Sequence, residues 1–184
     1  SLLQAFELRT GRFTSPHLES PLERISLNGT HITPTFFNYT YNDIAPYIDL
    51  IDQRSDSNGV PLSYFEIMTA IAFAAFADAP IDVAVLEAGM GGEWDATNVV
   101  SSDVAVMMPI GLDHQEYLGE TIAEIAETKA GIFESGKPVV MAHQEMEAAQ
   151  VLMRKAAEME AFAEENQIDQ ICQHKDGKEP IQSP

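Results

Sequence analysis

The run LEAGMGGEWDATNVV, Leu86–Val100, narrows the possible folds of this chain more than any other segment. An apolar segment, Ile81–Leu86, is followed at once by the carboxylate of Glu87 and then by a glycine-rich loop. Buried parallel strands consist of continuous β-branched or small residues, and open α/β sheets bind ligands where such strands end. We therefore predict a strand buried on both faces that places Glu87 at a ligand crevice. The alternative is a strand end followed by an ordinary turn, because a lone Gly-x-Gly-Gly is weak evidence.

Helical and strand patterns alternate along the rest of the chain, which predicts an α/β fold with a mainly parallel sheet. Helical spacing over Ile44–Ile51 indicates a helix with Pro46 in its first turn. Ser63 and Glu66 form a capping-box pattern that opens a second, nearly apolar helix. The further elements we predict are a buried strand at Asp103–Ile110, a helix opened by Thr121 and Glu124, a strand at Pro138–Ala142 and a helix at Gln144–Ala163.

Composition limits the classes of function. The 184 residues carry a formal net charge of −19 with only ten Lys and Arg, which are scattered, so nucleic acid and anionic membranes are excluded as partners. The apolar stretch Tyr64–Ala77 is too short to span a membrane. Cys172 is the single cysteine and permits no internal disulfide, which suits a reducing cytosol, so we expect a cytoplasmic protein.

Three segments carry a family resemblance. They are FTSPHLESPLERISLNG at Phe13–Gly29, the glycine-loop run at Leu86–Val100, and IGLDHQEYLGETIAEIAETKAGIFESGKPVV at Ile110–Val140. Together they resemble, in order and spacing, the folylpolyglutamate synthase/dihydrofolate synthase branch of the Mur ligase family. The resemblance implies a three-layer α/β domain with a mainly parallel sheet, of the Mur ligase central-domain type.

The same resemblance implies that parts of an enzyme lie outside this sequence. Family members carry a phosphate-binding loop ending in Gly-Lys-Ser or Gly-Lys-Thr before the matched region, and a separate carboxyl-terminal domain after it. We expect residues 1–163 to be a partial central domain that lacks its N-terminal phosphate-loop strand, with Ser1–Leu8 as the end of the helix after that loop. Residues 164–184 contain few large apolar side chains, and we expect a disordered or aberrant tail.

The implied activity is that of an ATP-dependent carbon–nitrogen ligase that adds L-glutamate to dihydropteroate or folate through an acyl phosphate. Mg²⁺ is the implied cofactor and a monomer the implied state when intact, whereas the chain alone is expected to be inactive. Whether the first glutamate is added or a tail extended stays open. The alternatives are another Mur-type amino-acid ligase, or a non-catalytic remnant or ligand-binding domain, since nothing here cradles ATP phosphates.

The resemblance also assigns metal-site residues. Ser15 and Glu87 match the ligands of one magnesium ion, and His114 matches a ligand of a second. Lys129 matches a lysine that CO₂ carbamylates to give an anionic oxygen ligand. The structural alternatives are a loop histidine that bonds a backbone carbonyl and a lysine that interacts with the helix macrodipole.

The acceptor site follows from the same comparison. Four residues at the head of the apolar helix match the family's pterin-contacting segment: Ser63, Tyr64, Phe65 and Glu66. Trp94 matches a further contact in the glycine-rich loop. Core packing is an equal alternative for Tyr64 and Phe65. We expect His17 and Arg24 to shape the acceptor loop.

Overall fold

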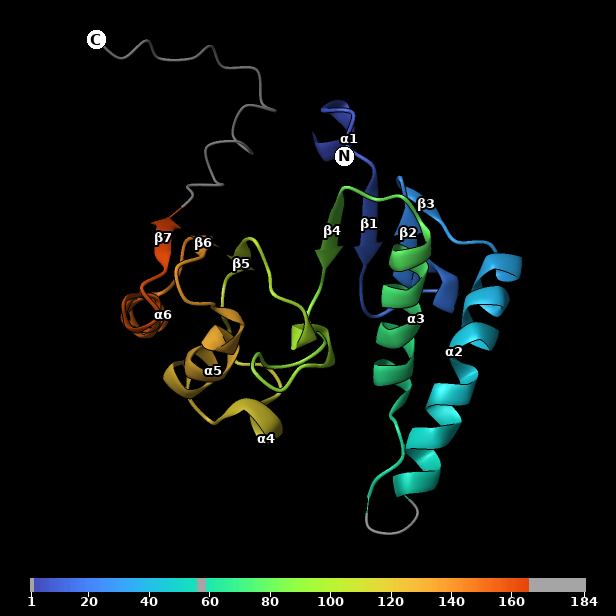
Figure 1. Ribbon diagram of the computed structural model, residues 1–184. Coiled ribbons are helices and arrows are strands. Elements are labelled where there is room, and N and C mark those ends of the chain that lie inside the picture. Colours follow the sequence, from blue (N-terminus) through green and yellow to red (C-terminus); the bar gives the residue numbers. More distant parts are fainter. Residues whose placement is uncertain (1, 56–58, 166–184) are drawn as a thin grey trace. The chain divides into compact units, whose positions relative to one another are not determined.

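The computed structural model describes residues 2–55 and 59–165, which form two compact units (Figure 1). The first comprises Ser1–Gly89 with Asp95–Val99, and the second comprises Met90–Trp94 with Val100–Pro184. Both units combine helices with parallel strand pairs, which confirms the predicted α/β class. No helix of the described residues is both long and apolar enough to cross a lipid bilayer.

A four-stranded sheet forms the framework of the first unit, in the order β3-β2-β1-β4. Its strands are β1 (Thr10–Phe13), β2 (Ile25–Leu27), β3 (Thr30–His31) and β4 (Val83–Leu86). β4 runs parallel to β1, whereas β2 is antiparallel to both β1 and β3. Asn28 and Gly29 connect β2 to β3 with φ of 50° and 79°, as a two-residue hairpin turn of type I′ requires.

Two long helices complete the first unit, α2 (Pro34–Ser55) and α3 (Tyr64–Asp78), and they lie side by side (Figure 1). α3 begins at the predicted capping box: Ser63 Oγ accepts from the N–H of Glu66 (3.2 Å), and Glu66 Oε2 accepts from that of Ser63 (2.7 Å). One face of α3 packs on the sheet. The buried core consists of Phe13, Ile25, Ile32, Met68, Ile71, Ala72, Ala75 and Phe76.

The prediction that a helix starts near Ile44 is wrong, because α2 begins ten residues earlier and Pro46 lies in its interior. Pro34 occupies the first helical position, where the missing N–H costs no hydrogen bond, and Thr33 Oγ1 accepts from the N–H of Phe36 (3.2 Å). Phe36 and Ile44 both pack against the core of this unit. We infer that this packing offsets the backbone hydrogen bond lost at Pro46.

The second unit contains a parallel sheet in the order β5-β6-β7, made of β5 (Ala105–Met107), β6 (Pro138–Met141) and β7 (Phe162–Glu165). The predicted capping box of Thr121 and Glu124 opens α5 (Ile122–Lys129), and α6 (Met146–Glu158) packs beside it. The shorter helices of the chain are α1 (Leu2–Ala5), η1 (Pro21–Arg24), η2 (Ala96–Val99), α4 (Gln115–Leu118) and η3 (Ala130–Ile132).

The helix predicted to reach Ala163 stops at Glu158. Glu160 takes φ of 52°, and the N–H of Ala161 donates to the carbonyl of Ala156 (2.8 Å), a helix-ending turn usually made by glycine. β7 then follows and includes positions 164 and 165, which were expected to begin the tail, so that boundary is wrong. Residues 166–184 lie outside the described part of the chain.

β4 and β5 each have one strand neighbour within their own unit: β4 pairs with β1 and β5 pairs with β6. The burial of both strands on two faces stays a prediction.

Candidate functional site

Ser15 and Glu87 are brought together by the parallel pairing of β1 and β4. Phe13 pairs with Leu86 at the carboxyl ends of these two parallel strands, so the residues that follow both strands lie at the same end of the sheet. The N–H of Ser15 donates to Glu87 Oε2 (2.8 Å), and the N–H of Glu87 donates to the carbonyl of Phe13 (3.0 Å). The predicted position of Glu87 at a strand end is confirmed, with Ser15 beside it.

This pair offers hard oxygen ligands to a cation. Glu87 Oε2 is engaged by a backbone N–H, which leaves Oε1 and the hydroxyl of Ser15 as neighbouring oxygen donors. Mg²⁺ prefers oxygen and commonly takes only one or two groups from the protein, with water and phosphate completing its shell. No cluster of three or more His, Cys, Asp or Glu suited to a metal occurs among the described residues. The residues therefore fit a magnesium ion shared with a phosphate ligand, and do not fit an all-protein cage.

Side chains at the head of α3 are largely engaged in structural contacts. Ser63 and Glu66 cap the helix, and these hydrogen bonds hold the pKa of the Glu66 carboxyl below its ordinary value. The half-buried ring of Phe65 lies 5.8 Å from that of Phe13 and covers Gly89, where an added Cβ would lie 2.4 Å from the ring. Tyr64 is 53% exposed. Of these four residues, Tyr64 alone presents its ring to solvent as a surface for a ligand.

His114 lies in a strained loop of the second unit. It precedes α4 with φ of 50° and ψ of 37°, a left-handed conformation that costs energy for a residue with a side chain. Asp113 Oδ1 accepts from the N–H of His114 (2.8 Å), and Asp113 Oδ2 lies 3.5 Å from His114 Nε2. Among the described residues, the His114 side chain has Asp113 as its neighbouring polar group and makes no hydrogen bond to a backbone carbonyl. The imidazole is exposed and close to a carboxylate.

The two glycine motifs of the sequence pack directly on one another beside Lys129. A Cβ added at Gly92 would lie 2.4 Å from the carbonyl oxygen of Thr128 and 2.9 Å from that of Lys129. A Cβ at Gly131 would lie 2.4 Å from the backbone nitrogen of Glu93. Both glycines are therefore required by close backbone contact, and together they fix the glycine-rich loop against the end of α5.

Neighbouring carboxylates of α5 are engaged away from Lys129. Glu127 pairs with Lys155 (2.5 Å) and Arg154 (2.6 Å), and these cations lower the pKa of its carboxyl. Glu124 accepts hydrogen bonds from the N–H groups of Thr121 and Glu120, and these bonds lower the pKa of its carboxyl. Lys129 is half-buried and forms no ion pair with another described residue.

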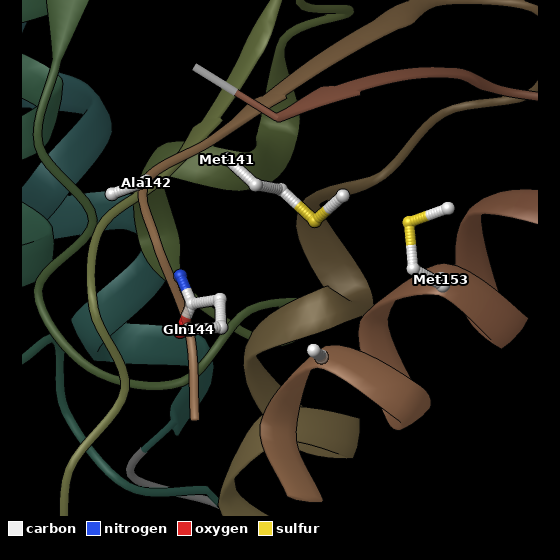
Figure 2. A pocket seen from close by; sticks show the side chains of 5 residues that line it. Met141, Ala142, Gln144 and Met153 are labelled. Carbon is white, nitrogen blue, oxygen red and sulfur yellow. The ribbon is translucent and has the colours of Figure 1, made fainter. Parts of the chain in front are cut away.

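Gln144 is a buried polar residue that sequence reasoning did not single out. Its Nε2 donates to the carbonyl of Met108 (3.0 Å), and its Oε1 accepts from the N–H of Ile110 (3.0 Å). It thereby fixes the loop that leaves β5 toward His114. Figure 2 shows Gln144 beside a hollow of about 60 Å³ that Met141 and Met153 also line. Substrate pockets are several times larger, so this hollow is no substrate site.

The predicted site residues divide between the two units. Ser15, Glu87 and the α3 head belong to the first, whereas Trp94, His114 and Lys129 belong to the second. Trp94 is 91% exposed. Contacts within one unit join Ser15 with Glu87, Ser63 with Glu66, and Lys129 with the glycine-rich loop.

Residues 61–181 match the Mur ligase middle domain. The chain belongs to the Mur ligase family. The dihydrofolate synthase/folylpolyglutamate synthase of Mycobacterium tuberculosis is 49% identical over 171 residues, which are 88% of this chain and 35% of that protein. Crystal structures of Mycobacterium tuberculosis folylpolyglutamate synthase complexed with ADP and AMPPCP give a TM-score of 0.84 at 48% identity, covering 89% of this chain and 38% of theirs.

A second solved structure extends the comparison within the Mur ligase family. An FPGS–AMPPCP–folate complex gives a TM-score of 0.83 at 34% identity, over 89% of this chain and 40% of that one. The family resemblance inferred from the three sequence segments is therefore confirmed. The chain spans about a third of the length of the curated relative.

Proposed function

We propose that this chain forms part of the catalytic centre of an ATP-dependent carbon–nitrogen ligase that adds L-glutamate to dihydropteroate or folate through an acyl phosphate. The observation that carries the proposal is the Ser15–Glu87 pair at the adjacent ends of β1 and β4. Relatives that carry the folylpolyglutamate synthase name, and the nucleotide and folate complexes of such proteins, support the choice of substrates.

In this proposal Glu87 and Ser15 hold Mg²⁺ through the carboxylate oxygen and the hydroxyl that the protein leaves available. When bound, the cation neutralises charge that develops on the transferred phosphoryl group. The N–H of Ser15 keeps the Glu87 carboxylate in one orientation, because it occupies the other oxygen at 2.8 Å. Orientation matters since electrostatic stabilisation is largest when the charged group need not reorganise.

His114 and Lys129 are proposed to serve a second magnesium ion. Carbamylation of Lys129 joins the neutral amine nitrogen to the carbon of CO₂ and releases a proton, which leaves an anionic carboxylate on the side chain. Two findings favour it: Glu124 and Glu127 are engaged elsewhere, and the glycine-rich loop fixes the backbone at Lys129. A lysine that only interacted with the helix macrodipole would require neither a fixed backbone nor neighbouring carboxylates that are engaged elsewhere.

The acceptor is proposed to contact the head of α3, where Tyr64 offers an exposed ring and Phe65 packs against Phe13. Trp94 is proposed as a further contact on the family resemblance alone. Ser63 and Glu66 act by fixing the start of the helix. We further propose a cytoplasmic monomer that binds neither nucleic acid nor membrane, in keeping with its net charge of −19.

The test uses two proteins: the chain alone, and a chimera in which it replaces the matching segment of the Mycobacterium tuberculosis relative. With ATP, Mg²⁺, L-glutamate and either dihydropteroate or folate, the chimera should form an amide product and ADP. The chain alone should form none, since it spans about a third of the relative. Comparing the two acceptors decides between first-glutamate addition and tail extension.

Three outcomes would each overturn a part of the proposal. A folded chimera that binds ATP and yet makes no product with either acceptor would remove the ligase assignment. Turnover above background by the chain alone would show that the flanking two thirds of the relative are dispensable. A chimera that accepts only a peptidoglycan precursor would assign the chain to another Mur-type ligase.

A further inference from the structure

A buried cation links the Ser15 loop to the head of α3. Arg24 is 9% exposed, and its Nε–H donates to His17 Nδ1 (2.8 Å). Its guanidinium carbon lies 5.3 Å from the ring centroid of Tyr64, within the range of a cation–π contact. His17 lies two residues after Ser15, so one arginine contacts both the loop of the metal pair and the exposed tyrosine.

The hydrogen bond fixes which nitrogen of His17 carries the proton. An arginine Nε–H only donates, so Nδ1 must accept and therefore carries no hydrogen. The ring proton then lies on Nε2, because a neutral imidazole has one N–H. The hydrogen bond of His17 to a described side chain is made by Nδ1 to Arg24, and the nearby Glu23 carboxylate interacts with the ring electrostatically.

The rest of this loop is already hydrogen-bonded. The Glu23 carboxylate accepts from the N–H groups of Leu18 (2.9 Å), Glu19 (3.1 Å) and Ser20 (2.7 Å). These hydrogen bonds hold the pKa of the Glu23 carboxyl below its ordinary value, and the bond from the Leu18 N–H has the largest effect. The loop is thus preformed, and His17 Nε2–H is a fixed donor.

We infer that His17 contacts the acceptor substrate, donating its Nε2–H to a carbonyl oxygen or ring nitrogen of a planar heteroaromatic group that lies along Tyr64. Arg24 is the positioning residue that sets the tautomer and steadies the tyrosine ring. The inference rests on the proposed function, because it takes the acceptor from there.

The first test is spectroscopic and uses the 184-residue chain without substrate. With ¹⁵N-labelled histidine near pH 8, His17 should show an unprotonated Nδ1 and a protonated Nε2. In Arg24→Met the same resonances should move toward a mixture of tautomers. A proton found on Nδ1 of the wild-type chain, or a spectrum unchanged by Arg24→Met, would overturn the inference whatever the activity.

The second test uses the chimera and two nearly isosteric variants. His17→Gln keeps an oxygen for Arg24 and an N–H for the substrate, whereas His17→Glu keeps the oxygen and has no donor. His17→Glu should raise KM for the acceptor by about tenfold, as expected for an unpaired hydrogen-bonding group, while KM for ATP stays unchanged. His17→Gln should restore an acceptor KM close to that of the wild type.

The outcomes separate the two proposals. Equal acceptor KM for the Gln and Glu variants, or an equal rise in KM for ATP, would overturn the role of His17 while leaving the ligase intact. A wild-type chimera without product would overturn the ligase, and with it the substrate contact, even if the tautomer is as expected.

Discussion

The contact between the glycine-rich loop and the end of α5 gives the sharpest test of the structure. Replacing Gly92 by alanine puts a Cβ 2.4 Å from the Thr128 carbonyl oxygen, 2.9 Å from that of Lys129 and 3.1 Å from the Cα of Gly131. All three atoms belong to backbone, so no side chain can rotate away. Overpacking of this kind costs about 1–3 kcal/mol, and contact with backbone places Gly92→Ala toward the upper end.

The measurement is thermal unfolding of the 184-residue chain, followed by circular dichroism. A loss of about 1–3 kcal/mol lowers Tm by about 2–12 °C in a chain of this length. Gly111→Ala is the matched control, because an added Cβ there meets no heavy atom within 4 Å and its φ is not positive. The control should leave Tm unchanged or raise it slightly, since alanine restricts the unfolded chain. Equal Tm for the two variants would refute the close contact.

Three further predictions concern the carboxylates and Lys129. In the chimera, Glu87→Ala should lower kcat by about 10²–10³-fold with folding intact, as when an electrostatic stabiliser is lost, and near-normal kcat at limiting magnesium would contradict the metal assignment. Lys129→Ala should be nearly inactive and partly rescued by a short carboxylic acid from solution, whereas full activity would exclude the carbamate. Glu124 has a lowered pKa in the folded chain, so its charge stabilises above about pH 4.5 and less as pH falls through the folded pKa. The difference in Tm between wild type and Glu124→Gln should therefore shrink on acidification from pH 7 to pH 3, and a constant difference would contradict the capping role of the charge.

Local signals in the sequence predicted local structure well. The pairs Ser63/Glu66 and Thr121/Glu124 start helices as expected, because a capping box is complete within four residues. The position of Glu87 followed from a strand and the residue after it. Asn28–Gly29 carried an equally local hairpin signal that the helix and strand patterns did not use.

Features that depend on distant residues were not predictable in the same way. Gln144 acts on carbonyl and N–H groups 36 and 34 positions earlier in the chain, and nothing in its neighbourhood indicates this. The end of α6 was missed because Glu160, and not a glycine, adopts the left-handed turn.

The edge strand β3 has a consequence for the colloidal behaviour of this chain. β3 ends the sheet of the first unit, and its two residues, Thr30 and His31, are polar and exposed. Such a short polar edge offers few unpaired backbone groups as a template for pairing with another chain. Salt at about 1 M shortens the reach of the repulsion from a net charge of −19 to about 3 Å, so pairing of copies through this edge should stay weak even in concentrated salt.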